Sequence, residues 1–183
     1  MAHFEAAQWL PVPLPKVFAF FSDPSNLPRI MPAELKVRLE RSSLVSPKTG
    51  SGETFPGLAL DKVAGAGSEF VFSFCPIPWL LIIRMEWRAR IEEWKAGSFV
   101  PGNDSSPSYF RDSQLSGPMR QWNHRHEFLA EPRDGREGTL IRDVVDFEIG
   151  YGWPGRLLER SFVLPSMRKS FTHRQRQVEQ ALG

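Results

Sequence analysis

The order of hydrophobic and polar positions predicts a strand and two short helices at the start of the chain. Residues 3–10 can be divided into two sets of alternate side chains, one for each face of a strand, and Pro11 and Pro13 follow them. This pattern predicts a strand that ends at the prolines. Apolar positions recur at helical spacing from Leu14 to about residue 22. Asp23 followed by Pro24 is a typical start for a second short helix, which is expected to end near Ile30.

The middle of the chain has the period of strands. Leu35, Val37 and Leu39 alternate with charged residues, which is typical of a half-buried strand. Residues 42–57 are rich in Ser, Gly and Pro and predict a long loop, whereas the later turns are short enough to join antiparallel neighbours. The later strands are expected at 69–74, 82–94, 109–114, 121–131 and 139–149.

The last part of the chain predicts one long helix over 154–182. Apolar residues recur there every seven positions, at Leu157, Leu164, Phe171 and Val178, and Pro165 is expected to kink the helix. The opposite face is expected to be solvated and carries Arg156, Arg160, Arg168, Lys169, Arg174 and Arg176. The expected fold class is therefore α+β, with a curved antiparallel sheet of six or seven strands around the terminal helix and space for a cavity between them.

Composition narrows the class of protein. The chain has 183 residues, of which 41% are hydrophobic and 24% charged, which fits a single domain over 1–183. The formal net charge of +2 is too small to indicate a nucleic-acid partner. The one cysteine, Cys75, leaves no internal disulfide or thiol cluster and favours the cytoplasm. The N-terminal residues have no secretory pattern, and the apolar run at 76–83 is far shorter than the roughly 20 residues of a spanning helix, so no stable membrane insertion is expected.

Polar residues interrupt the predicted buried faces of three strands. Trp122, His124, His126 and Phe128 share one face because side chains alternate along a strand, and the aromatic residues at both ends indicate that this face is buried. On the preceding strand Phe110, Asp112 and Gln114 share one face. Because the two strands are expected to pair, we expect Asp112 within reach of a histidine. Asp143 is the one polar residue on the otherwise apolar face of the last strand. Because an unpaired buried charge is costly, it needs His124, His126 or an arginine as partner.

This constellation has several interpretations. The polar pairs can fix strand register, orient a ligand, or carry out acid–base chemistry with a histidine. A His-x-His pair with Asp112 can also hold a metal, but two histidines at this spacing give a weak signal without a third placed ligand. The sequence therefore predicts no metal and no cofactor. The segment Gly150-Tyr-Gly-Trp-Pro-Gly155 matches a dinucleotide fingerprint, but too few residues follow for a βαβ unit, so a tight strand-to-helix turn is expected.

The pattern F-x-D-x-Q-x-x-G-P over 110–118, followed by W-x-H-x-H-x-F over 122–128, resembles a bacterial subfamily of the START-like, or SRPBCC, superfamily of helix-grip domains. That superfamily includes pollen allergens, polyketide cyclases and lipid-transfer domains. The resemblance covers nearly the whole chain and implies a hydrophobic ligand cavity between sheet and helix. The expected ligand contacts are Trp87, Phe110, Asp112, Gln114, Trp122, His124, His126, Phe128, Asp143, Phe147, Leu164, Met167 and Phe171.

The function expected from these features is binding, transport or sequestration of a small hydrophobic or amphipathic molecule by a monomer or homodimer. One alternative is a cyclase, dehydratase or hydrolase that uses the His and Asp residues of the cavity. Another is an interaction module whose cavity is filled by its own side chains. The connection at 42–67 is either a lid or an inert insertion.

Overall fold

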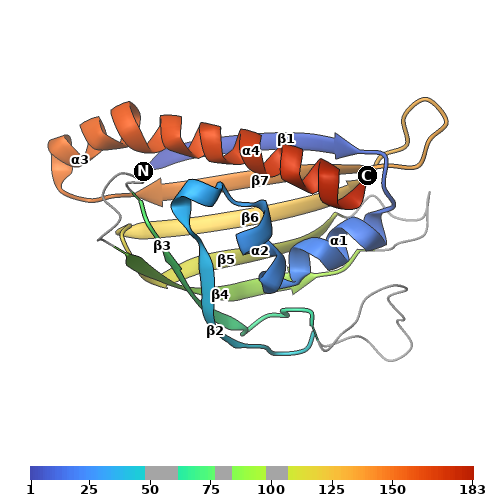
Figure 1. Ribbon diagram of the computed structural model, residues 1–183, viewed down its shortest axis with the longest axis horizontal. Coiled ribbons are helices and arrows are strands. Elements are labelled where there is room, and N and C mark those ends of the chain that lie inside the picture. The colour runs from blue at the N-terminus through green and yellow to red at the C-terminus, as the bar shows by residue number, and fades with distance from the viewer. Residues whose placement is uncertain (48–61, 77–83, 98–106) are drawn as a thin grey trace.

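The computed structural model describes residues 1–47, 62–76, 84–97 and 107–183. Within them seven antiparallel strands form one sheet, in the order β1-β7-β6-β5-β4-β3-β2 (Figure 1). The strands are β1 (Ala2–Leu10), β2 (Arg38–Ser43), β3 (Glu69–Phe74), β4 (Met85–Lys95), β5 (Ser108–Ser116), β6 (Gln121–Ala130) and β7 (Thr139–Glu148). The α+β fold class and the antiparallel sheet are confirmed.

The helices cover one face of this sheet. The short helices are α1 (Leu14–Ser22), a 3-10 turn (Pro24–Asn26), α2 (Leu27–Ile30) and a second 3-10 turn (Ala33–Leu35). The side chain of Asp23 accepts a hydrogen bond from the backbone N–H of Ser25, which is the predicted cap. α4 lies along β1, α2 contacts α4, and α1 packs against β6 (Figure 1).

The C-terminal helix begins at Gly152, two residues earlier than predicted. It consists of α3 (Gly152–Leu158), a π-helical turn (Glu159–Val163) and α4 (Leu164–Leu182). Pro165 lies two residues after the end of the π-helical turn, so the helix accommodates the expected disturbance by widening one turn.

Two predictions about the faces of this helix are wrong. The seven-residue repeat predicts Leu157 in the core, but this side chain is 61% exposed. The π-helical turn contains one more residue than an α-helical turn. The row of inward-facing side chains on α4 therefore does not continue at the same seven-residue spacing into α3. Arg174 is predicted on the solvated face, but it is 7% exposed. Arg174 lies seven residues after Met167 and four before Val178, both of which are buried.

The strand predicted around Leu35 begins later. Lys36 has a left-handed backbone with φ of 46°, so residues 33–35 form a 3-10 turn and β2 starts at Arg38. Ser42 and Ser43, which belong to the predicted loop, pair with Phe70 and Glu69 of β3. Residues 48–57 of the predicted loop, and residues 82 and 83 of the predicted fourth strand, lie outside the described residues.

The core has two clusters. One is built on Phe18, Phe110 and Phe128, whose rings contact one another. The other contains Phe4, Val145, Phe147 and Met167. Asp143 lies on β7 between Ile141 of the first cluster and Val145 of the second, so the polar residues of the sheet lie where the two clusters meet. Among the described residues, no helix is long and apolar enough to cross a membrane.

The turn from β7 into α3 requires glycine for two different reasons. Gly150, Tyr151 and Gly152 all have positive φ, and a side chain on Gly155 would overlap the carbonyl oxygen of Gly150. The glycine spacing of this segment is thus explained by a tight strand-to-helix turn, as predicted.

We expect Gly155→Ala to lower the free energy of unfolding by about 2 kcal/mol or more, because the turn must open to admit the methyl group. Chemical denaturation measures the change. Gly135→Ala is the control for the clash, since a Cβ added there would meet no atom within 4 Å, although Gly135 has a positive φ and Gly155 is helical. Equal losses for the two variants would show that close packing at Gly155 is unimportant.

Candidate functional site

A cavity of about 630 Å³ opens between the sheet and the helices. Most of its lining side chains are apolar and come from α1, α2, β3, β4, β5, β6 and α4. The polar residues Asp112, His124, His126 and Arg174 also line it. An apolar wall with a few convergent polar groups is the usual composition of a small-molecule site.

Strand register brings the polar residues together. Asp112 of β5 lies opposite His124 of β6, and His126 of β6 lies opposite Asp143 of β7. His124, His126 and Phe128 are all buried, as their shared parity predicted. Two carboxylates therefore flank a pair of histidines on one face of three adjacent strands.

The carboxylate of Asp143 is the centre of this group. Its Oδ1 is 2.7 Å from Nδ1 of His126 and 3.1 Å from Nε2 of His124. Nη2 of Arg174 lies 3.6 Å from the same oxygen. The prediction that Asp143 needs a histidine or an arginine as partner is confirmed. Asp143 contacts both histidines and an arginine at the same time.

Asp112 lies on the cavity side of the histidines. Its Oδ2 is 3.5 Å from Nε2 of His126 and 3.8 Å from Nδ1 of His124. The two imidazole rings are close, with centroids 3.7 Å apart. The predicted approach of Asp112 to a histidine is confirmed.

The charges in this cluster shift the pKa values in different directions. Burial alone would raise the pKa of Asp143, but Arg174 and the two histidines hold it well below its usual range. Burial would likewise raise the pKa of Asp112, and the contacts with His126 and His124 outweigh it and lower the pKa. Both groups are therefore carboxylates at neutral pH.

The two histidines differ from each other. Burial lowers the pKa of His124, and the nearby charge of His126 lowers it further. Burial acts in the same direction on His126, but the carboxylates of Asp143 and Asp112 outweigh it and raise the pKa. His126 is thus the histidine that more readily holds a proton.

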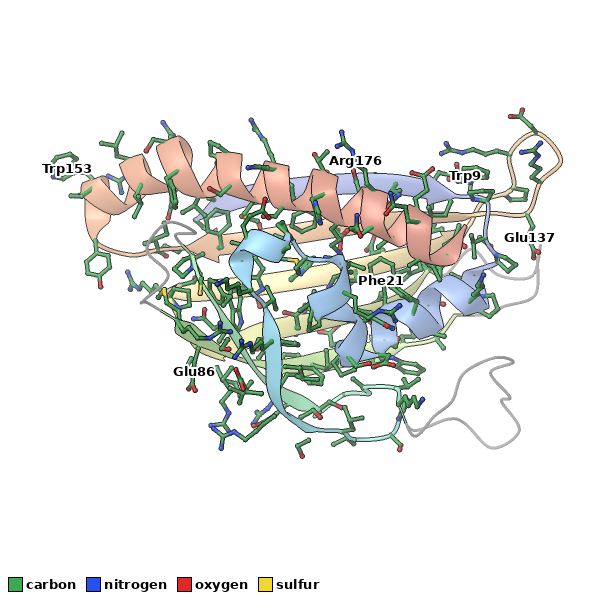
Figure 2. All side chains as sticks on the ribbon, in the orientation of Figure 1. Trp9, Phe21, Glu86, Glu137, Trp153 and Arg176 are labelled. Carbon is green, nitrogen blue, oxygen red and sulfur yellow. The ribbon has the colours of Figure 1, made fainter. Side chains whose placement is uncertain are left out.

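Sequence reasoning missed Arg174, although its spacing from Met167 and Val178 signals an inward position. In the structure its guanidinium carbon lies 4.9 Å from the ring centroid of Phe21 and 5.4 Å from that of Phe171. Aromatic faces attract a cation, so these rings help to hold Arg174 against the cavity. Arg176, two residues later, points away from the sheet (Figure 2).

The short helices supply a second group of lining residues that the sequence did not identify. Phe20, Phe21, Leu27, Ile30 and Met31 line the cavity from α1, α2 and the residue after α2. Their helical spacing was visible in the sequence, but it does not show that the two short helices fold back over the sheet.

The structure divides the predicted ligand contacts into two sets. The cavity is lined by Trp87, Phe110, Asp112, Trp122, His124, His126, Met167 and Phe171. The other five residues do not line it. Phe128 and Phe147 are fully buried in the core, Leu164 packs against the second core cluster, and Asp143 lies behind the histidines. Gln114 bonds instead to Met119 in the turn between β5 and β6.

Two of the sequence-based expectations concern the size and rim of the cavity. The described side chains leave about 630 Å³ free, which weighs against an interaction module with a filled cavity. Much of the connection at 42–67, expected as a lid or an insertion, and most of the apolar run at 76–83 lie outside the described residues. Ala64 is described and lines the cavity.

No protein-family model matches the sequence, and no curated protein matches it. Solved structures do match. The protein TTHA0849 from Thermus thermophilus superposes with a TM-score of 0.61 at 16% identity, over 99% of this chain and 97% of that chain. A START superfamily protein from Mycobacterium smegmatis gives 0.57 at 10% identity, over 98% and 96% of the two chains.

A third match is the di-domain ARO/CYC protein BexL from the BE-7585A biosynthetic pathway. Its TM-score is 0.59 at 14% identity, over 98% of this chain and 47% of the longer one. At these identities the likeness establishes the fold. The chain has the START-like helix-grip fold that the motif pattern implied.

We expect Arg174→Met to lower the free energy of unfolding by about 3 to 5 kcal/mol, because Asp143 loses its buried cation. Urea denaturation measures the change. Arg176→Met is the matched control on the exposed side of the same helix and should cost less than about 0.5 kcal/mol. Adding Asp143→Asn to Arg174→Met should recover part of the loss. A cost for Arg174→Met equal to that of the control would contradict the role assigned to this ion pair.

Proposed function

We propose that the protein binds a small hydrophobic or amphipathic molecule in the cavity between the sheet and the C-terminal helix. The observation that carries this proposal is a cavity of about 630 Å³ whose mainly apolar wall contains a cluster of polar side chains, those of Asp112, His124, His126 and Arg174. The volume lies within the range of about 300 to 1,000 Å³ that is typical of small-molecule sites.

The distribution of side chains supports an amphipathic ligand. The rings of Trp122 and Phe171 contact that of His124, and Trp87 packs against Trp122. Phe70 and Phe72 extend the apolar wall. Burying the apolar part of a ligand there contributes roughly 25 cal/mol per Å² before the costs of binding. The cluster of polar side chains then orients the polar end of the ligand, because a buried polar atom needs a hydrogen-bond partner.

The monomer or homodimer, the cytoplasmic location and the role in transport or sequestration stay part of this proposal. Cys75 is buried, and no thiol pair exists in the chain, which supports a reducing compartment.

One observation favours an enzyme as the second candidate function. His124 and His126 line the cavity, and the carboxylate of Asp143 contacts a nitrogen of each ring from behind. A carboxylate that orients a histidine is the arrangement used in general acid–base catalysis. A cyclase or dehydratase acting on a polyketide-like substrate is the reaction class that fits this candidate.

Native mass spectrometry of the purified protein, followed by denaturation and identification of released small molecules, tests binding without a prior choice of ligand. The binding proposal expects a hydrophobic or amphipathic compound at one per chain. Repeated preparations with no such compound, together with no binding of the fluorescent amphipathic probe 8-anilinonaphthalene-1-sulfonate, would contradict it. Turnover of the released compound by the protein would establish the enzyme instead.

We expect Ser170→Trp to weaken binding of the anilinonaphthalene probe at least about tenfold, because Ser170 lines the cavity and the indole would fill part of it. Fluorescence titration measures the affinity. Lys169→Trp is the matched control, since residue 169 is exposed on the same helix and does not line the cavity. Equal affinities for both variants would place the probe outside the cavity.

A further inference from the structure

Three potential metal ligands meet at the wall of the cavity. Asp112, His124 and His126 each offer one ligand atom, and these atoms lie within 4.8 Å of one another. Oδ2 of Asp112 approaches Nδ1 of His124 and Nε2 of His126. Among the described residues, this is the one group of three or more His, Cys, Asp and Glu residues with such spacing. Both histidines are buried, and all three residues line the cavity.

The distances between these atoms fit a shared cation better than direct hydrogen bonds. The oxygen of Asp112 is 3.5 Å from one nitrogen and 3.8 Å from the other, beyond the usual range of about 2.7 to 3.2 Å for a hydrogen bond. Ligands that bind zinc at about 2.0 to 2.1 Å in a tetrahedron lie about 3.4 Å apart. Small movements of side chains would therefore complete the coordination.

The opposite nitrogens of the two rings are already held. Nε2 of His124 and Nδ1 of His126 both contact Oδ1 of Asp143, which is itself near Arg174. Metal-binding histidines in proteins typically bond through the second nitrogen to a carboxylate, which fixes the ring and its tautomer. Asp143 supplies that contact to both rings at once.

The charge of the surroundings also suits a cation. Asp112 and Asp143 supply two acidic side chains, and Arg174 supplies one basic side chain. Histidines bind a metal as neutral rings, so metal binding displaces any proton on His126, and a divalent ion more than neutralises the formal charge of about −1 that is left.

We propose that Asp112, His124 and His126 bind a divalent transition-metal ion, with zinc as the ion that fits the donor set and its spacing. Two histidines and one carboxylate leave at least one coordination position open, as in catalytic metal sites. That position faces the cavity, where an oxygen atom of a ligand can occupy it. The metal site does not depend on the identity of that ligand.

The sequence named Asp112 as a companion of the His-x-His pair, but it did not place the carboxylate as a third ligand, so the signal was too weak to predict a metal. Register between β5 and β6 places Asp112 opposite His124.

Isothermal titration of the tag-free, metal-stripped protein with Zn²⁺ alone tests the proposal. One ion per chain is expected, and Asp112→Asn should lower the affinity at least about 10- to 100-fold. His3→Ala is the matched control, because His3 contacts Glu5 and Asp146 on the surface and is the obvious adventitious site. It should bind Zn²⁺ like the unmodified protein.

Titration with Co²⁺ gives a second measurement on the unmodified protein, which does not depend on whether a variant folds. Visible absorption bands of a four- or five-coordinate site are expected, and Zn²⁺ should remove them. Zn²⁺ affinity that is unchanged in Asp112→Asn, or lost in His3→Ala, would overturn the proposal. So would a Co²⁺ spectrum identical to that of the hydrated ion. Failure of metal binding leaves probe binding in the cavity intact, so the two proposals fail separately.

Discussion

The rest of the structure depends on one buried carboxylate, that of Asp143. Its oxygen contacts His124 and His126 from the neighbouring strand and Arg174 from the terminal helix. A charge removed from water costs several kcal/mol unless it is paired, so these partners must stay in place. The pairing therefore favours the observed register of β6 against β7 and the observed position of α4 over the sheet. Apolar packing is less directional and would tolerate several alternatives.

The same interaction gives the cavity its polar corner. Because Asp143 lies behind the histidines, it turns their other nitrogens toward Asp112 and the open volume. The aromatic residues around them, Trp122, Phe171 and Phe21, keep this corner enclosed by apolar surface. Electrostatic interactions act more strongly there than in water. The three roles proposed for this corner, which are ligand orientation, acid–base chemistry and metal binding, would all use this one arrangement.

Several predicted elements match the structure because their signals are local. The alternation of Trp122, His124, His126 and Phe128 predicts their common face, since strand geometry has a period of two. The Asp23-Pro24 pair predicts the second helix start for a similarly local reason. The errors arise where contacts with distant parts of the chain, or an irregular turn, decide which side chains are buried. The π-helical turn shifts the faces of the C-terminal helix, so Leu157 becomes exposed. Arg174 is buried because its partner, Asp143, belongs to another element.

The sequence by itself determined the order of strands and helices, the α+β class and the residue types on each strand face. These follow from periodicity and turn chemistry, which act within about ten residues along the chain. Only the tertiary structure decided which polar atoms meet, which side chains line the cavity and which lie behind it. The distances between the polar atoms depend on the register between β5, β6 and β7 and on the position of α4. A difference of one residue in register would turn each side chain to the other face, so chemistry at the site depends on contacts between residues far apart in the sequence.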